Sequence, residues 1–238
     1  LLNHDDPATR TTVGNNYPFT RWLSRQETVS QGYAWQGREI WRVRDGAKTR
    51  VGALDDLAIP GDCNRANALM ALAIAAEMGI PGEQATRILQ EFPGVPHRLE
   101  RVRQVRGVTL YNDSKATTPA ALGAALDTLQ GPVILIAGGY DKGLPLEELG
   151  RKIAVRCKAV VLLGANREKM AQAIPAGTAQ ALCETLQVEN LDQALPRAFS
   201  LARTGDNILF SPGTSSYDQY ANFEARGEHF KGLAALLA

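Results

Sequence analysis

The second part of the chain alternates strand-like and helix-like segments, and this alternation constrains the fold more than any other feature. Short apolar runs bounded by glycine, proline or polar residues predict strands at residues 108–111, 132–137, 159–163, 185–188 and 207–210. The longer stretches around them predict helices at 120–129, 146–157, from 167 onward, 191–203 and 216–237. Because parallel strands are joined by long crossovers, usually helices, we predict an α/β fold with a doubly wound, mainly parallel sheet.

The first part of the chain has a different pattern. Two strand-like pieces, 33–35 and 39–43, flank a glycine-containing turn and predict a hairpin. Other strand-like pieces of this part have no evident partners. Residues 62–78 predict a helix capped by Asp62, and residues 81–92 predict a second helix.

Residues 92–96, Phe-Pro-Gly-Val-Pro, mark the best domain boundary, because two prolines and a glycine so close together interrupt regular structure. The chain has 238 residues, which allows one or two domains at roughly 150 residues each. We therefore predict two domains, covering residues 1–94 and 95–238, with a hinge at this boundary.

Composition argues against several classes of protein. The 26 basic and 25 acidic residues give a net charge of +1, whereas nucleic-acid binders carry a basic excess, so we expect no nucleic-acid partner. No apolar run reaches the ~18 residues of a membrane span, so we expect no membrane contact. Three widely spaced cysteines without a C-x-x-C pair favour a cytoplasmic protein without a metal framework. The chain has no signal-peptide pattern and does not begin with Met, which indicates a piece of a longer protein.

Polar clusters follow three of the predicted strands, at residues 111–119, 138–143 and 210–218. The first contains Lys115, the second contains Lys142 after paired glycines, and the third contains four hydroxyl side chains. Ligands of open α/β sheets bind outside the carboxyl ends of the strands, where helix N-termini also favour anions. The three clusters together therefore predict an anion-binding cleft.

Each cluster taken alone has a plainer interpretation. The first fits a helix cap with solvated charges, the second a tight turn, and the third an ordinary serine-rich helix start. The second cluster also lacks the spacing of a P-loop, and no H-E-x-x-H pattern is present. His4 and His229 are assigned no chemistry, whereas His97-Arg98 is of interest because a guanidinium binds phosphate with two parallel hydrogen bonds.

Three motifs carry a resemblance to a known family. They are Asn112-Asp113-Ser114-Lys115-Ala116-Thr117, Pro96-His97-Arg98, and the helix start Gly61 with Asn64-x-x-Asn67. Together they resemble the Mur ligase family, the ATP-dependent amide-bond synthetases that add amino acids to the peptidoglycan precursor. The ending 211–227, Ser-Pro-Gly-Thr-Ser-Ser-Tyr-Asp-Gln-Tyr-Ala-Asn-Phe-Glu-Ala-Arg-Gly, resembles the members that add D-glutamate.

The resemblance implies a domain assignment. Residues 1–94 would be the C-terminal part of a central ATP-binding domain, and 95–238 a Rossmann-like domain that binds the amino acid. The family's P-loop, its magnesium ligands and its uridine nucleotide domain would lie outside this chain. One departure is Cys63, where the family commonly has His, so no role is carried over to that side chain.

The resemblance also implies roles for particular residues. Asn64 and Asn67 would contact the adenine side of ATP. Arg98, Asp113 and Lys115 would reach its phosphates across the domain junction and serve as the catalytic residues. Contacts to D-glutamate would come from Thr117, Lys142, Ser216, Tyr217 through its backbone, and Phe223. The implied cofactors are ATP and Mg²⁺, with the metal held mainly by residues outside this chain.

The implied reaction joins D-glutamate to UDP-N-acetylmuramoyl-L-alanine through an acyl phosphate, in a cytoplasmic, monomeric enzyme with small-molecule partners. We expect the chain to be inactive by itself, because the P-loop that would hold ATP is missing. Two alternatives remain: another ligase of the superfamily, such as a different Mur ligase or a folylpolyglutamate synthase, and a non-catalytic ligand-binding α/β domain.

Overall fold

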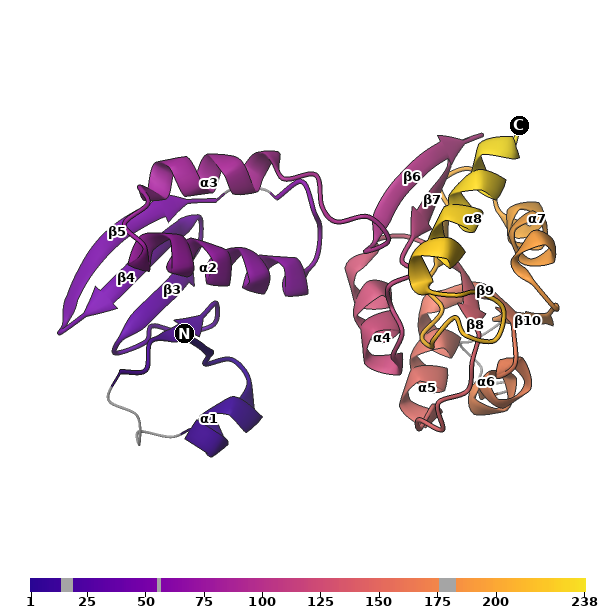
Figure 1. Cartoon of the computed structure of the whole chain (residues 1–238), viewed down its shortest axis with the longest axis horizontal. Coiled ribbons are helices and arrows are strands. Elements are labelled where there is room, and N and C mark those ends of the chain that lie inside the picture. The colour runs from indigo at the N-terminus through magenta and orange to yellow at the C-terminus, as the bar shows by residue number, and fades with distance from the viewer. Residues whose placement is uncertain (14–18, 55–56, 176–182) are drawn as a thin grey trace. The chain divides into compact units, whose positions relative to one another are not determined.

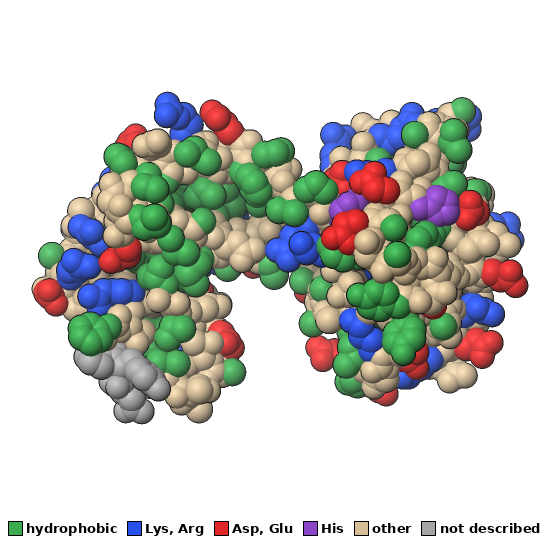
Figure 2. Space-filling view, in the orientation of Figure 1, with side chains coloured by type: hydrophobic (Ala, Val, Ile, Leu, Met, Phe, Trp, Pro, Cys, Tyr) green, Lys and Arg blue, Asp and Glu red, His purple; other side chains and the backbone are tan. Residues whose placement is uncertain are grey.

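The structure, a computed structural model, describes residues 1–13, 19–54, 57–175 and 183–238. It divides into two compact units, Leu1–Pro93 and Gly94–Ala238, each with its own sheet and hydrophobic core (Figure 1). The division falls within the Pro-Gly-rich segment at residues 92–96. Basic and acidic side chains are interspersed over the visible face of each unit (Figure 2).

The first unit contains a five-stranded sheet in the order β1-β2-β3-β4-β5. Its strands are β1 (Leu2–Asn3), β2 (Trp22–Ser24), β3 (Gly32–Gln36), β4 (Glu39–Arg44) and β5 (Ala47–Ala53). The predicted hairpin is confirmed as β3 and β4, which pair antiparallel. The expectation that other strand-like pieces lack partners was wrong, because β2 pairs parallel with β3 and β5 pairs antiparallel with β4.

Three helices accompany this sheet: α1 (Pro7–Val13), α2 (Asp62–Glu77) and α3 (Gly82–Glu91). The two predicted helices are confirmed as α2 and α3, and Leu69 and Leu72 of α2 pack with Tyr33 of β3 in the core. The prediction that Asp62 caps α2 was wrong, because the cap position is Gly61 and no side chain caps this end. Asp62 is the first helical residue instead, where its carboxylate still interacts favourably with the helix dipole.

The second unit contains a six-stranded sheet in the order β10-β9-β8-β11-β7-β6. All its pairings are parallel except that of the edge strand β6 with β7. Its strands are β6 (Glu100–Val105), β7 (Val108–Asn112), β8 (Val133–Gly138), β9 (Cys157–Leu163), β10 (Glu184–Gln187) and β11 (Asn207–Phe210). Its helices are α4 (Pro119–Thr128), α5 (Glu147–Arg156), α6 (Arg167–Ala173), α7 (Leu191–Leu201) and α8 (Phe223–Leu236).

The helices of this unit cover both faces of the sheet, as a strand's alternating side chains require. On β8, Val133 and Leu135 lie in one core cluster with residues of α4, α5 and α6. Ile134 and Ile136 lie in the other cluster, with residues of α7 and α8. The predicted α/β fold with a Rossmann-like, doubly wound and mainly parallel sheet is therefore confirmed.

The last helix is shorter than predicted. Its first residue is Phe223, whereas Ser216 to Asn222 form turns in which the Ser216 carbonyl accepts a hydrogen bond from Tyr220 N. Asn222 caps the helix through its side chain, which accepts a hydrogen bond from Ala225 N. In a helix that began at Ser216, Ala225 N would bond to a carbonyl of the preceding turn. Here the Asn222 side chain takes that place, so the helix can begin at Phe223 and the serine-rich segment can form a loop.

Within the described residues, none of the helices has the length and apolar character that spanning a bilayer requires.

Gly138 at the end of β8 offers a test of this packing. Its φ is +113°, and a Cβ at this position would overlap the carbonyl oxygen of Leu163 on β9. We expect Gly138→Ala to lower the free energy of unfolding by about 2 kcal/mol, within the range for a strained backbone position. Gly232→Ala is the control, because a Cβ there meets nothing within 4 Å and should be neutral or stabilising. Urea unfolding followed by circular dichroism compares the two, and equal effects would contradict the expectation.

Candidate functional site

The loops after β7, β8 and β11 meet at one edge of the second sheet. Strand β11 lies between β8 and β7 and runs parallel to both, so the carboxyl ends of the three strands are neighbours. Here the order of strands in the sheet departs from their order in the chain, which is where α/β sheets open a crevice for ligands. These loops are the three predicted polar clusters.

Hydrogen bonds join the loops after β7 and β11, beginning with Asp113 N, which donates to the Phe210 carbonyl at 2.7 Å. The Ser211 hydroxyl donates to the Asp113 carboxylate at 2.7 Å, and Gly213 N donates to the Ala116 carbonyl at 2.9 Å. Ser211 and Asp113 are both buried, so their hydrogen bond is shielded from water. The two loops therefore form a fixed pair.

The loop after β8 joins this pair from the other side. Tyr140 N donates to the Ser215 carbonyl at 3.0 Å, and the Thr214 hydroxyl donates to the Tyr140 carbonyl. Lys142 Nζ reaches across to the Thr117 carbonyl at 3.1 Å. The structure therefore brings Thr117, Lys142 and the serine-rich loop together, as the convergence of the three clusters predicted.

The two lysines of the loops have no acidic partners among the described residues. Lys115 is exposed, and its Nζ lies 5.3 Å from the centroid of the Phe223 ring. Lys142 is also exposed and donates only to the Thr117 carbonyl within the described structure. The neighbouring Asp141 pairs instead with Lys169 at 3.1 Å. Two ammonium groups without carboxylates leave this edge of the sheet suited to anions.

The hydroxyl groups and aromatic side chains of the third loop differ in exposure. Ser216 is buried, whereas Tyr217 is 71% exposed and lies outside the core. Phe223, the first residue of α8, is half-buried. The predicted cap of α4 is confirmed, because the Thr118 hydroxyl accepts a hydrogen bond from Ala121 N and Pro119 follows it.

Asp113 lies inside the protein. Its carboxylate oxygens accept hydrogen bonds from Leu99 N at 3.0 Å and from Ser211 Oγ at 2.7 Å. Burial raises the pKa of this carboxyl to about 6, although the hydrogen bonds from Ser211 and Leu99, and the charge of Arg98, oppose the rise. Arg98 itself is exposed. The contacts of Asp113 therefore fix the start of its loop.

Sequence reasoning missed Arg226 of α8, whose side chain is only 1% exposed. Its Nη2 donates to the carbonyls of Ser114 at 2.8 Å and Thr214 at 3.1 Å, and its Nε donates to Ser114 Oγ at 3.1 Å. Burial lowers the pKa of the guanidinium to about 10. A basic residue on an apolar helix face, three residues after Phe223, was the available signal.

His97 was singled out as part of the Pro96-His97-Arg98 motif, without a role of its own, and the structure shows it buried with φ of +63°. Its Nδ1 lies 2.9 Å from the Asn112 side-chain nitrogen, and its carbonyl accepts a hydrogen bond from Lys115 N at 3.0 Å. Gly227 gives the ring its space, because a Cβ there would overlap the imidazole. His97 therefore anchors the loop that carries Lys115.

Asn64 and Asn67 lie on α2 of the first unit. The Asn64 amide donates to the Pro60 carbonyl at 2.7 Å, whereas Asn67 is exposed. Cys63 is exposed as well. Among the described residues, no group of three or more His, Cys, Asp or Glu side chains is arranged to hold a metal ion.

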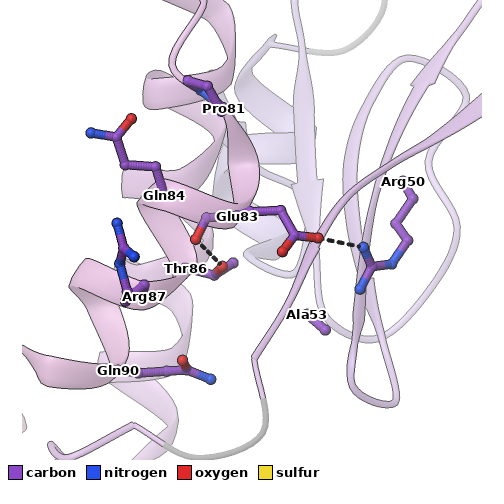
Figure 3. A pocket seen from close by; sticks show the side chains of 8 residues that line it. All are labelled: Arg50, Ala53, Pro81, Glu83, Gln84, Thr86, Arg87 and Gln90. Carbon is purple, nitrogen blue, oxygen red and sulfur yellow. Dashed lines mark hydrogen bonds and ion pairs between the residues drawn. The ribbon is translucent and has the colours of Figure 1, made fainter.

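Two of the larger hollows in the described residues have linings that lie mostly outside the three loops. One, of about 630 Å³, lies between β5 and α3, where Arg50 pairs with Glu83 at 3.1 Å (Figure 3). The other, of about 840 Å³, lies between α4 and α5 and begins at Thr118. Neither contains a predicted site residue.

The position of Asp113 predicts a pH dependence. Because its pKa is higher in the folded protein than the ordinary value of 3.8, folding binds a proton between about pH 4 and 6. The contribution of Asp113 to the free energy of unfolding is therefore greatest below about pH 4 and is lost as the pH rises through about 6. We expect the unfolding free energy of the native chain to fall relative to that of Asp113→Asn over this interval, by about 1–3 kcal/mol. Urea unfolding at several pH values measures the difference, and a constant difference would refute the expectation.

Comparison of the sequence with known proteins shows the family of the chain. Residues 97–213 match the family model described as Mur ligase, glutamate ligase domain. The chain is 36% identical over 241 residues to the UDP-N-acetylmuramoylalanine–D-glutamate ligase of Symbiobacterium thermophilum, covering 100% of this chain and 52% of that protein. It is 37% identical over 232 residues to the ligase of the same name from Nitrosospira multiformis, covering 97% of this chain and 48% of that protein.

Solved structures agree with this placement at the level of the fold. The MurF ligase from Thermotoga maritima in complex with ADP matches with a TM-score of 0.60 at 18% identity, over 97% of this chain and 52% of that one. A pseudomurein peptide ligase type C from Methanothermus fervidus matches with a TM-score of 0.69 at 14% identity, over 98% of this chain and 56% of that one. The chain spans about half the length of the curated relatives it matches. Through its glutamate ligase domain, the chain belongs to the Mur ligase family.

Proposed function

We propose that the complete protein is an ATP-dependent ligase that joins D-glutamate to UDP-N-acetylmuramoyl-L-alanine in peptidoglycan precursor synthesis. The observation that carries the proposal is the meeting of Lys115, Lys142 and the serine-rich loop at one sheet edge, in a chain whose relatives at 34–37% identity bear this activity in their names. This chain then supplies the amino-acid site and part of the ATP site, with residues 1–94 belonging to the ATP-binding domain and 95–238 to the amino-acid-binding domain.

D-Glutamate brings two carboxylates, which need cationic and hydroxyl partners when they leave water. Lys142, Thr117 and Ser216 are the proposed partners, joined by the Tyr217 backbone and the Phe223 ring. The hydrogen bond between Lys142 and the Thr117 carbonyl supports the assignment, because it keeps the ammonium group beside the loop hydroxyls. An incoming carboxylate offers that ammonium group a stronger, charged acceptor.

The residues also suit the phosphates of ATP. Arg98 and Lys115 are exposed cations, and phosphoryl transfer depends mainly on positioning and charge neutralisation. Asp113 contributes from beneath by holding the loop of Lys115, through its bonds to Leu99 and Ser211. Asn64 and Asn67 would contact the adenine side. Mg²⁺ would be held mainly by residues outside this chain.

The reaction has two steps. The carboxylate of the nucleotide-linked alanine attacks the γ-phosphorus, which forms an acyl phosphate and releases ADP. The amine of D-glutamate then attacks the acyl carbon, the amide bond forms, and phosphate and a proton leave. Lys115 and Arg98 would offset the negative charge that builds up on the phosphoryl oxygens, and the Lys142 loop would orient the amine.

A ligase of the same superfamily for another amino acid is the second candidate. A folylpolyglutamate synthase from Mycobacterium tuberculosis is among the structural matches, at 22% identity, which reflects a shared fold alone. The serine-rich ending and the names of the relatives favour D-glutamate. We further propose a monomeric cytoplasmic enzyme whose partners are small molecules.

Ligand titration tests the amino-acid site. We expect Lys142→Ala to weaken D-glutamate binding at least about ten-fold, the loss typical of a charged hydrogen bond, as measured by NMR titration of the chain. Lys152→Ala is the matched control, because this lysine pairs with Asp127 at 2.6 Å outside the three loops. Unchanged D-glutamate affinity in Lys142→Ala would overturn the assignment.

An activity assay tests whether this chain needs the rest of the ligase for turnover. We expect this chain alone to release no ADP in response to D-glutamate and UDP-N-acetylmuramoyl-L-alanine, because no P-loop is present in its sequence to hold ATP. A coupled assay for ADP measures it, with the complete ligase as the positive control. ADP release by the chain that depends on D-glutamate would show that the expectation is wrong.

A further inference from the structure

The ring of Phe223 lies beneath the ammonium group of Lys115. The Lys115 Nζ is 5.3 Å from the ring centroid, within the distance at which a cation and an aromatic face attract each other. Among the described residues, no carboxylate lies at ion-pairing distance from this lysine, and no hydrogen bond from its Nζ is formed. The aromatic face is therefore the interaction that orients the Lys115 side chain.

The ring itself is held from several sides. The His97 imidazole meets it edge to face, with centroids 6.1 Å apart and planes at 78°. The Phe223 carbonyl accepts a hydrogen bond from Ser114 Oγ at 2.8 Å, and Asn222 before it caps α8. The His97 carbonyl in turn accepts from Lys115 N, so the same residue fixes both the lysine backbone and the ring.

We propose that Phe223 is a positioning residue for Lys115: through a cation–π contact, its ring holds the ammonium group where the site takes the anionic phosphoryl group. The role of the anion rests on the proposed ligase function, whereas the contact between the two side chains does not. The half-buried ring orients the Lys115 side chain without forming an ion pair with it. The ammonium group can therefore still pair with an anionic ligand. A carboxylate in the same place would neutralise that charge instead.

This role differs from contact between Phe223 and D-glutamate. An apolar contact depends on the shape of the ring, whereas a cation–π contact depends on the negative charge of its face. Replacing Phe223 with trifluorophenylalanine keeps the shape nearly unchanged and weakens the charge of the face. Phe223→Tyr keeps both, and Phe223→Leu removes both.

The first measurement uses NMR of the whole chain with labelled lysine. We expect the ε-methylene protons of Lys115 to show an upfield ring-current shift that persists in Phe223→Tyr and disappears in Phe223→Leu. Phe19→Leu is the matched control, because Phe19 is 89% exposed and should leave Lys115 unaffected. Lys115 signals that are unchanged in Phe223→Leu would overturn the proposal.

The second measurement uses pyrophosphate and D-glutamate as probes. We expect the trifluorophenylalanine variant to bind pyrophosphate roughly two- to five-fold more weakly, the equivalent of a cation–π contact at an exposed site, and to lose more affinity for pyrophosphate than for D-glutamate. A loss confined to D-glutamate would overturn the positioning role. A ring-current shift that persists while neither probe binds would refute the proposed ligase function and leave the Phe223–Lys115 contact intact.

Discussion

The placement of β11 between β7 and β8 is the constraint on which the rest of the second unit depends. It makes three strand ends neighbours that are far apart in the chain, so each following loop can bond directly to the next. The bonds run mainly through backbone groups and buried hydroxyls, such as Tyr140 N to the Ser215 carbonyl. These bonds do not use the Lys115 side chain, and Lys142 donates only to the neutral Thr117 carbonyl, so both ammonium groups remain available for a ligand.

Charge is arranged in two layers at this edge of the sheet. The buried layer contains Arg226, which binds neutral carbonyls of two loops and has no carboxylate at hydrogen-bonding distance among the described residues. Above it lie Lys115 and Lys142, exposed and likewise without acidic partners in the described part of the chain. Asp218 acts on the Arg226 guanidinium through its charge but forms no hydrogen bond with it, and a buried cation without a directly bonded carboxylate favours an anionic ligand.

The sequence predicted much of this unit, because strands buried on both faces leave strong apolar signals. The loops were also predictable, since Lys115, Lys142 and the serines each follow such a strand. β6 was not predicted, because an edge strand with only Val102 and Val105 as apolar residues resembles a loop. The start of α8 was misplaced because several consecutive hydroxyl residues offered caps, and only tertiary contacts select Asn222. The position of Arg226 on an apolar helix face indicated burial, but its hydrogen-bond partners, two backbone carbonyls and the Ser114 hydroxyl, could not be identified from the sequence.

The most direct test of the account is to map D-glutamate on the chain by amide chemical shifts. If the three loops form the amino-acid site, the shifts that move on titration should cluster at residues 113–118, 139–143 and 211–217. A cluster elsewhere, for example around Arg50 and Arg87 in the hollow of the first unit, would contradict the account.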